Sequence, residues 1–349
     1  MGSDKALIAM SGGVDSSVAA FLTLQAGYPA IGATMQLTDS AADSIADAAS
    51  VASGLGIAHH VLDFSALFRE TVIKDFIQCY EQGLTPNPCV CCNRRIKFDA
   101  LLQAAISLGC SHIVTGHYAR IRHDKATGRY LLYKAIDPAK DQSYFLSCLS
   151  QQQLSHTLLP LGELTKAQVR QIAEQQGFIN ARKRDSQDIC FIPDGDYLAF
   201  MERCTGKQYP AGDFLDRQGN VVGKHKGAVG YTLGQRKGLG LSMGTPVYVC
   251  SKDMEKNTVT VGPEEALFAT TLVARDWHWF PFPALTQPIR VTAKARYRHI
   301  EQPATVYPEE NGRAKVVFDT PQRAMTPGQT VTLYQGDMVV GGGTIAEVF

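Results

Sequence analysis

The hydrophobic and polar positions of the first half of the chain predict short strands that alternate with helices. Apolar runs of strand length are followed by segments in which apolar residues recur at helical spacing. This alternation is typical of a parallel sheet with helices on both faces, whose ligands bind at the carboxyl ends of the strands. The predicted strands are 6–10, 30–35, 58–62 and 112–115, and the predicted helices are 18–26, 44–53, a longer tract ending at Glu81, and 98–108.

The second half has a different pattern. From about Ile192 frequent glycines divide the chain into short segments, and from about Leu267 residues alternate as in strands separated by turns. We predict a small β-barrel or sandwich from the strands 289–297, 314–318, 330–334 and 338–340. The expected domains are an α/β domain over 1–195, a glycine-rich central domain over 196–265, and a β-barrel over 266–349.

Composition narrows the class of protein. Of the 349 residues 45% are hydrophobic and 19% are charged, as in an ordinary folded protein, and the formal net charge is only +1. A polyanion site must therefore come from local clusters of positive charge. The first apolar run is too short for a signal peptide and no run approaches 18 residues, so we expect a cytoplasmic protein without membrane contact. The odd number of cysteines, 9, favours free thiols over a disulfide framework.

The first chemical motif is a loop, Ser11-Gly12-Gly13-Val14-Asp15-Ser16-Ser17, between a predicted strand and a helix. Glycines permit a tight turn that aims backbone N–H groups inward, and the helix start and three serine hydroxyls add to this anion site. The loop is not a Walker A motif, because no Gly-Lys-Ser/Thr follows. A plain turn in which Asp15 caps the helix is the alternative.

This loop resembles the SGGxDS signature of the PP-loop ATP pyrophosphatases. The resemblance implies that ATP is split between its α- and β-phosphates and that an oxygen of the substrate is adenylated. It also implies that Asp15 acts in catalysis beside the pyrophosphate, together with Mg²⁺ carried by ATP. We expect no other tightly bound metal.

Cysteines form the second motif. Cys89, Cys91 and Cys92 lie on a proline-containing segment that we expect to be a loop just before a helix with three basic residues. A helix start and nearby cations stabilise thiolates, so Cys92 is well placed to be reactive. A zinc site is an alternative, although neighbouring thiols on one loop surround an ion poorly. Cys190 follows the basic run 182–184, and by itself it would be a buried small residue.

The two thiol segments, with 115–120, 140–146, 234–240 and 295–298, resemble the tRNA-specific 2-thiouridylase family (MnmA/TrmU), in the same order along the chain. The resemblance implies a PP-loop parallel-sheet catalytic domain, a central tRNA-binding domain and a C-terminal β-barrel. It implies a tRNA-uridine 2-sulfurtransferase that adenylates the C2 oxygen of the wobble uridine (position 34). Persulfide sulfur then replaces that oxygen, giving 2-thiouridine, AMP and pyrophosphate.

The resemblance also assigns residues. Cys92 would be the nucleophile and Cys190 the persulfide carrier. Cys89 stands where many family members have an acidic residue, so it receives no acid–base role, and the segment 36–45 is shorter than usual. The implied ATP-binding residues are Ala9, Met10, Ser11, Gly12, Gly13, Val14, Asp15, Ser16, Ser17, Met35 and Gly116. The implied tRNA-binding residues are Asn87, Pro88, Cys89, His117, Lys140, Asp141, Gln142, Arg296, Tyr297 and Gln329.

The expected partners are tRNA and a protein that donates sulfur, either a cysteine desulfurase or a sulfur-relay protein. Two other functions stay open from the sequence. One is a PP-loop thiolase that modifies a different tRNA base, and the other is a non-catalytic RNA-binding or zinc module that retains the loop. Release of AMP and pyrophosphate separates enzyme from binder, and the mass of the modified nucleoside separates the thiolases.

Overall fold

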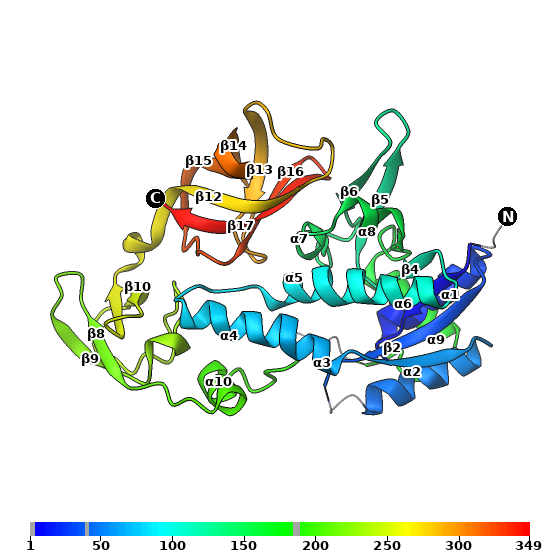
Figure 1. The fold of residues 1–349 in the computed structure, drawn as a ribbon, viewed down its shortest axis with the longest axis horizontal. Coiled ribbons are helices and arrows are strands. Elements are labelled where there is room, and N and C mark those ends of the chain that lie inside the picture. The colour runs from blue at the N-terminus through cyan, green and yellow to red at the C-terminus, as the bar shows by residue number, and fades with distance from the viewer. Residues whose placement is uncertain (1–3, 39–41, 184–188) are drawn as a thin grey trace.

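The computed structural model describes residues 4–38, 42–183 and 189–349. Figure 1 shows an α/β region at one end and, at the other, a β-barrel above a smaller glycine-rich region. Helix α4 and the helical run α5–α6 extend between them. Arg184 and the motif residues 185–188 lie outside the described residues, as does part of the segment 36–45.

A parallel sheet with the strand order β3-β2-β1-β4-β7 forms the α/β region. The strand order changes direction at β1, which lies between β2 and β4, and open α/β sheets bind ligands at such a point. The predicted fold class is confirmed. The strands are β1 (Ala6–Ala9), β2 (Ala30–Gln36), β3 (His59–Asp63), β4 (His112–Val114) and β7 (Thr157–Leu158).

Helices cover both faces of this sheet because β1 is apolar on both sides. Ala6 and Ile8 pack with helices α1, α2 and α9, whereas Leu7 and Ala9 pack with α6. Such a strand has no solvent face, which explains its unbroken apolar sequence. The helices are α1 (Val14–Gln25), α2 (Ala42–Gly54), α6 (Leu101–Ser107), α7 (Ser143–Leu146), α8 (Gln151–Ser155) and α9 (Lys166–Gln175).

Two long helical stretches project from the α/β region toward the barrel. The first comprises α3 (Ser65–Phe68), a π-helical segment (Arg69–Ile73) and α4 (Lys74–Glu81), which confirms the helical tract ending at Glu81. The second comprises α5 (Pro88–Cys92), a π-helical segment (Asn93–Ala100) and α6. The expectation that Cys89, Cys91 and Cys92 lie on a loop is therefore wrong, because all three lie in α5.

The early start of the second stretch has a local cause. Pro88 occupies the first turn of α5, where a missing N–H costs nothing, and the side chain of Asn87 accepts a hydrogen bond from the Val90 amide at 3.3 Å. Together they cap a helix whose first residues lack the apolar periodicity by which helices are recognised.

The glycine-rich region contains one helix and a small sheet of the order β10-β11-β8-β9. Phe214, Val249 and Val259 form the centre of its core. Its elements are α10 (Tyr197–Thr205), β8 (Gly212–Leu215), β9 (Val221–His225), β10 (Tyr248–Asp253) and β11 (Thr258–Gly262).

The C-terminal strands close into a barrel, because β12 pairs with both β15 and β17 at the ends of the order β12-β15-β14-β13-β16-β17. The predicted barrel is therefore confirmed, and the alternative of a sandwich is wrong. The hairpin of β5 (Ala119–Asp124) and β6 (Arg129–Lys134) comes from the α/β region but extends the barrel sheet, with Tyr133 opposite Met338. The barrel strands are β12 (Phe268–Trp279), β13 (Ile289–Lys294), β14 (Gln302–Pro308), β15 (Ala314–Arg323), β16 (Thr330–Gln335) and β17 (Met338–Val348).

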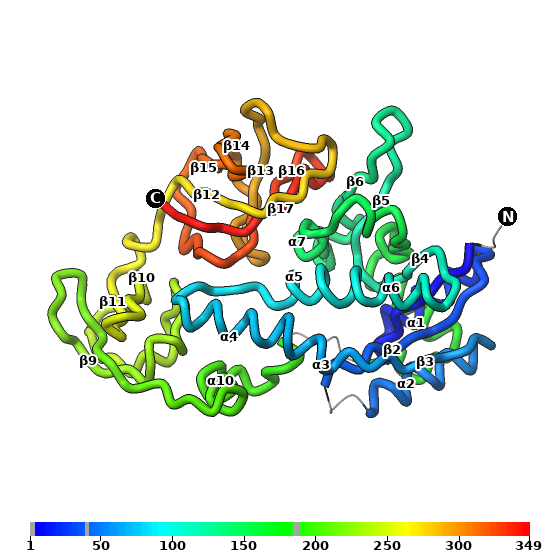
Figure 2. The backbone as a smooth tube through the Cα atoms, in the orientation of Figure 1, coloured from blue at the N-terminus to red at the C-terminus, as the bar shows by residue number. Residues whose placement is uncertain are grey.

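The barrel holds the segment that precedes α5. The Thr85 amide donates to the Pro327 carbonyl at 3.0 Å, and the Gln329 side chain donates to the carbonyls of Thr85 and Pro86 at 2.9 and 3.1 Å. Figure 2 shows this stretch of backbone passing below the barrel on its way from α4 to α5. The position of the thiol-bearing helix thus depends on the C-terminal barrel.

The nine cysteines all lie in the described ranges and all are free thiols. Within those ranges, no helix has the length and apolar character needed to cross a membrane.

Candidate functional site

The loop Ser11–Ser17 leaves β1 and leads into α1 at the point where the strand order reverses. Gly12 has φ +69°, and a Cβ there would overlap the carbonyl of Ser44, so the turn requires glycine. Gly13 caps α1 without a side-chain hydrogen bond. The first amides of the helix are therefore not capped by a protein side chain at this position, as an anion site requires.

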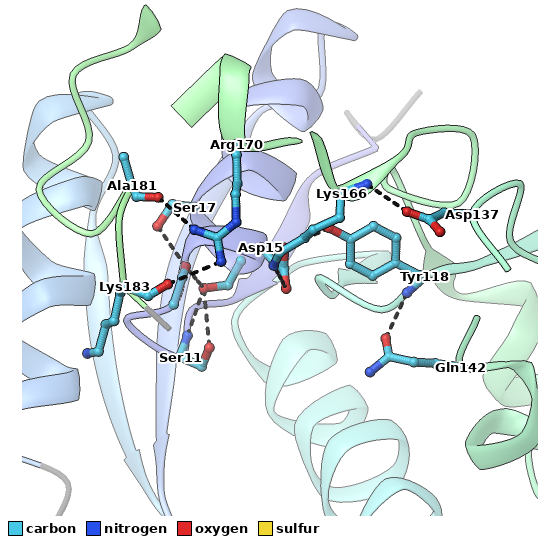
Figure 3. Close-up of polar contacts among 12 residues, drawn as sticks. Ser11, Asp15, Ser17, Tyr118, Asp137, Gln142, Lys166, Arg170, Ala181 and Lys183 are labelled. Carbon is cyan, nitrogen blue, oxygen red and sulfur yellow. Dashed lines mark hydrogen bonds and ion pairs between the residues drawn. The ribbon is translucent and has the colours of Figure 1, made fainter. Parts of the chain in front are cut away.

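Asp15 does not cap the helix. Its carboxylate accepts hydrogen bonds from the Tyr118 hydroxyl at 2.7 Å and from the Lys166 ammonium at 2.7 and 2.8 Å (Figure 3). The Lys166 side chain is only 11% exposed, so the ion pair is poorly screened by water. The alternative in which Asp15 caps the helix is therefore wrong, because its carboxylate forms an ion pair with Lys166 beside the loop.

Lys166 was not among the residues selected from the sequence. It is the first residue of α9, and Thr165 and Gln168 form a capping box that fixes this helix start. The loop lacks the lysine of a Walker A motif, and Lys166 brings a cation to it from 151 residues away. The capping-box sequence could have predicted the start of this helix. The contact between Lys166 and Asp15 could not have been predicted, because the two residues are far apart in the sequence.

The segment that follows α9 also contacts the loop. The Asn180 side chain donates to the Gly12 carbonyl at 3.1 Å and to the Ser17 hydroxyl at 2.9 Å. The Lys183 ammonium lies 3.4 Å from the Gly12 carbonyl and forms an ion pair with Asp47 at 2.7 Å. Asn180 was not predicted from the sequence, whereas Lys183 belongs to the basic run 182–184 noted above, and both contact the Gly12 carbonyl of the loop.

The other ATP-binding candidates lie around this loop. A Cβ on Gly116, at the end of β4, would come within 2.9 Å of the Asp15 and Ser16 backbone, so only glycine permits this approach. Ala9, Met10 and Val14 are buried, which leaves their backbone atoms as the groups that could face a ligand. Met35 is half-buried at the end of β2 and packs against the cluster that contains Cys92.

Cys92 lies at the end of α5 and is only 7% exposed. Burial raises the pKa of its thiol to about 12, although the charge of Lys97 acts in the opposite direction. The expectation that a helix start and basic neighbours favour the thiolate is therefore wrong for this conformation. Cys92 is a full turn into the helix and its environment is apolar.

Cys190 comes from a segment that is 98 residues later in the chain, yet its neighbour Phe191 packs against the cluster that contains Cys92. The charge on Cys190 is near enough to raise the pKa of Cys92. The next residue, Phe191, holds this segment in place: its ring contacts Phe68, a neighbour of Cys92, with a centroid distance of 5.6 Å. Cys190 itself is exposed.

Cys89 completes a group of three thiols. It is exposed, lies on the first turn of α5, and contributes to the raised pKa of both Cys92 and Cys190. Lys97 is the one cation whose charge opposes the rise in pKa of all three thiols, among the interactions that the described residues show. The described residues contain no group of three or more His, Cys, Asp or Glu side chains that could hold a metal ion.

Two of the remaining candidates, His117 and Tyr297, pack against aromatic rings. His117 hydrogen-bonds Thr115 at 2.8 Å and contacts the Phe98 ring, and burial holds its pKa well below its usual range. Tyr297 is 38% exposed and packs on the Phe145 ring at a centroid distance of 4.4 Å.

Several of the candidate tRNA contacts make internal hydrogen bonds instead. Asp141 accepts from the amides of Ala135 and Ser143, and Gln142 accepts from the Tyr118 amide at 2.9 Å. Arg296 donates to the Leu233 carbonyl and to the Thr326 hydroxyl. Asn87 and Gln329 hold the start of α5, as described above. These groups position the site, and any contact with RNA would be in addition.

Comparison with known families gives three consecutive matches. A model described as the tRNA methyl transferase HUP domain matches residues 4–194, and one described as the tRNA methyl transferase PRC-barrel domain matches residues 199–263. A third, the aminomethyltransferase beta-barrel domain, matches residues 269–345.

Curated relatives are similar over their full length. The tRNA-specific 2-thiouridylase MnmA of Acetivibrio thermocellus is 48% identical over 358 residues, which cover 99% of this chain and 100% of the relative. The protein of the same name from Moorella thermoacetica is 49% identical over 354 residues, covering 98% of this chain and 99% of the relative.

The geometry predicts that Lys166 is needed for ATP use. Replacement by methionine in Lys166→Met should leave the Asp15 charge unpaired beside the phosphates and lower pyrophosphate release about 100-fold or more. Pyrophosphate release with saturating tRNA is the measurement. Lys74→Met, which removes an exposed ion pair with Glu70, is the matched control and should leave the rate unchanged. A Lys166→Met rate within about threefold of the unmodified chain would contradict this role.

Proposed function

The chain belongs to the tRNA-specific 2-thiouridylase family, and we propose that it transfers sulfur to C2 of the wobble uridine of tRNA in an ATP-dependent reaction. One observation supports the proposal: Phe191, the residue after the exposed Cys190, packs against the cluster that buries Cys92, and so does Met35 of β2, the strand beside the one that leads into the anion-binding loop. The reaction has two steps. The anion-binding loop would bind the phosphates of ATP in the first step, and the two thiols would transfer sulfur in the second.

In the first half, ATP activates the base. A carbonyl oxygen is a poor leaving group, and transfer of AMP to the C2 oxygen, with loss of pyrophosphate, makes it displaceable. The loop amides and the hydroxyls of Ser11 and Ser16 would face the phosphates, and Lys166 would balance their charge beside Asp15. Mg²⁺ bound to ATP would supply further charge neutralisation there, with Asp15 as its protein contact.

In the second half, the sulfur moves. Cys190 carries a persulfide, and its terminal sulfur attacks C2 while AMP departs with the former C2 oxygen. The Cys92 thiolate then attacks the Cys190 sulfur, breaking the S–S bond of the persulfide. The terminal sulfur stays on C2, and a Cys92–Cys190 disulfide forms. Two thiols provide the two electrons that convert sulfane sulfur into the thiocarbonyl.

Burial of Cys92 affects its attack on the Cys190 sulfur, because it disfavours the thiolate. A thiol whose pKa is about 12 is protonated at neutral pH, so Cys92 must lose its proton when the complex forms. Lys97 is the cation whose charge favours the thiolate. His117 is close to Lys97 and is held neutral by burial, and we propose that it lines the base pocket without carrying charge.

The exposed position of Cys190 supports delivery of its sulfur by another protein, either a cysteine desulfurase or a sulfur-relay protein. The reaction at C2 requires the uridine to leave its stack, and Asn87, Pro88 and Cys89 at the start of α5 would surround it. Lys140, Arg296 and Tyr297 would contact the surrounding tRNA. We keep the division into 1–195, 196–265 and 266–349 as our proposal, and a cytoplasmic location with it.

Methyl transfer, which two of the family models carry in their descriptions, explains less of the site. It requires neither a phosphate-binding loop nor a second thiol. A thiolase for another tRNA base would use the same parts, and the modified nucleoside distinguishes it by its mass and retention.

The thiol pair gives a direct prediction. Cys92→Ser and Cys190→Ser should each reduce formation of 2-thiouridine to background, since serine neither carries sulfane sulfur nor reduces a persulfide. Nucleoside mass spectrometry of tRNA after reaction is the measurement. Cys204→Ser, an exposed thiol on α10, is the matched control and should retain full activity. Normal turnover by either of the first two variants would remove that thiol from the mechanism.

Tyr297 gives a prediction about tRNA. Tyr297→Ala removes an exposed ring that packs on Phe145, and it should weaken tRNA binding by about 1–3 kcal/mol if a base stacks there. Tyr297→Phe keeps the ring and should bind nearly as well. Filter binding at fixed salt measures both. Equal affinities of Tyr297→Ala and Tyr297→Phe would exclude a stacking role.

A further inference from the structure

We propose that Cys89 and Cys92 form a resolving dithiol, in which Cys89 opens the Cys92–Cys190 disulfide and releases Cys190 for the next persulfide. The inference rests on the sulfur transfer proposed above and adds a residue to it. Cys89-Val90-Cys91-Cys92 is a Cys-x-x-Cys sequence at the start of a helix, and the transfer proposed above uses Cys89 only to line the base pocket and gives its thiol no chemical step.

The geometry links the three thiols through two elements. Cys89 and Cys92 are one turn apart on α5, and Phe191, the residue after Cys190, packs against the cluster that contains Cys92. The fourth thiol nearby, Cys91, has a different direction: its sulfur donates to the Thr71 carbonyl at 3.6 Å. Cys89, one turn before Cys92 on the same helix, is therefore the thiol that we assign to open the disulfide.

Access favours Cys89 over an external reductant. An external thiol can reach the exposed sulfur of Cys190, but this attack expels the Cys92 thiolate, and a group with a pKa of about 12 leaves slowly. Attack on Cys92 would instead expel Cys190, which is exposed and can take up a proton from solvent as it leaves. The Cys92 sulfur is too deeply buried for an external protein, whereas Cys89 lies on the same helix.

The exchange is balanced. The Cys89 thiolate attacks the Cys92 sulfur, the bond from Cys92 to Cys190 breaks, and Cys190 leaves as a thiolate that takes up a proton. One disulfide is lost and one is formed, so no oxidant is needed. An external dithiol then reduces the new disulfide at the exposed Cys89 sulfur and becomes oxidised itself.

Helix geometry makes the new disulfide a transient one. Cβ atoms three residues apart on a helix are about 5–6 Å apart, and a disulfide requires about 3.5–4.5 Å. The first turn of α5 must therefore tighten. That turn contains Pro88, which donates no backbone hydrogen bond, so little helical bonding is lost. A strained disulfide is easily reduced, which suits a bond that must be reset after each turnover.

Disulfide mapping of the full chain tests the proposal. The reduced protein is oxidised with diamide, its remaining thiols are alkylated, and it is digested with trypsin without reduction. We expect an internal disulfide in peptide 75–94, localised to Cys89 and Cys92 by fragmentation, and alkylated Cys190 in peptide 185–203. In Cys89→Ser the two peptides should instead be joined by a Cys92–Cys190 bond.

Cys91→Ser is the matched control, since it removes the adjacent thiol on the same helix, and it should give the same disulfide as the unmodified chain. Oxidised Cys89→Ser should also be reduced by an external dithiol protein roughly tenfold more slowly than the unmodified chain. Cys89→Ala provides a second variant of the same position.

Joined peptides with alkylated Cys89 in the unmodified chain, or identical products from Cys89→Ser, would overturn the proposal. The mapping uses no ATP, tRNA or sulfur donor. Its failure is therefore distinct from failure of the proposed function, which would appear as thiolation by Cys92→Ser or Cys190→Ser.

Discussion

The contact of Phe191 with Phe68 is the interaction on which the chemistry of this protein depends. It attaches the Cys190 segment to the cluster that buries Cys92, and Phe191 contacts Phe76 and Phe200 as well. Two thiols separated by so long a stretch of chain would meet rarely in a flexible loop, because loop closure costs entropy. Aromatic pairs of this kind contribute about 0.5–1.5 kcal/mol each beyond simple burial, so several together can hold the segment in place.

The same region connects the two halves of the reaction. Met35 is the second-to-last residue of β2, the strand next to β1, and it packs against the cluster that contains Cys92, so this end of the sheet adjoins that thiol. From the other side, Gln329 and Pro327 of the barrel hold the start of α5. A tRNA bound against the barrel and the α/β region would therefore act on the elements that carry the reactive groups.

Much of this could be predicted from the sequence, because it depends on local patterns. The parallel sheet, the anion-binding loop and the C-terminal strands follow from periodicity, glycine positions and turn residues, whereas the pattern left open whether those strands form a barrel or a sandwich. Two features depend on tertiary contacts and could not be predicted: Lys166 reaches Asp15 from another helix, and burial reverses the expected pKa shift of Cys92. The early start of α5 has a local cause, its Asn87–Pro88 cap, but its first residues lack the apolar periodicity by which a helix is recognised.

The most direct test follows the oxygen that sulfur replaces. A tRNA whose wobble uridine carries ¹⁸O at C2 is incubated with the protein, ATP and a persulfide donor, and the released AMP is analysed by mass spectrometry. The account predicts one ¹⁸O atom in the AMP phosphate for each 2-thiouridine formed. Unlabelled AMP beside fully thiolated tRNA would show that the C2 oxygen leaves by another route, and would contradict the account.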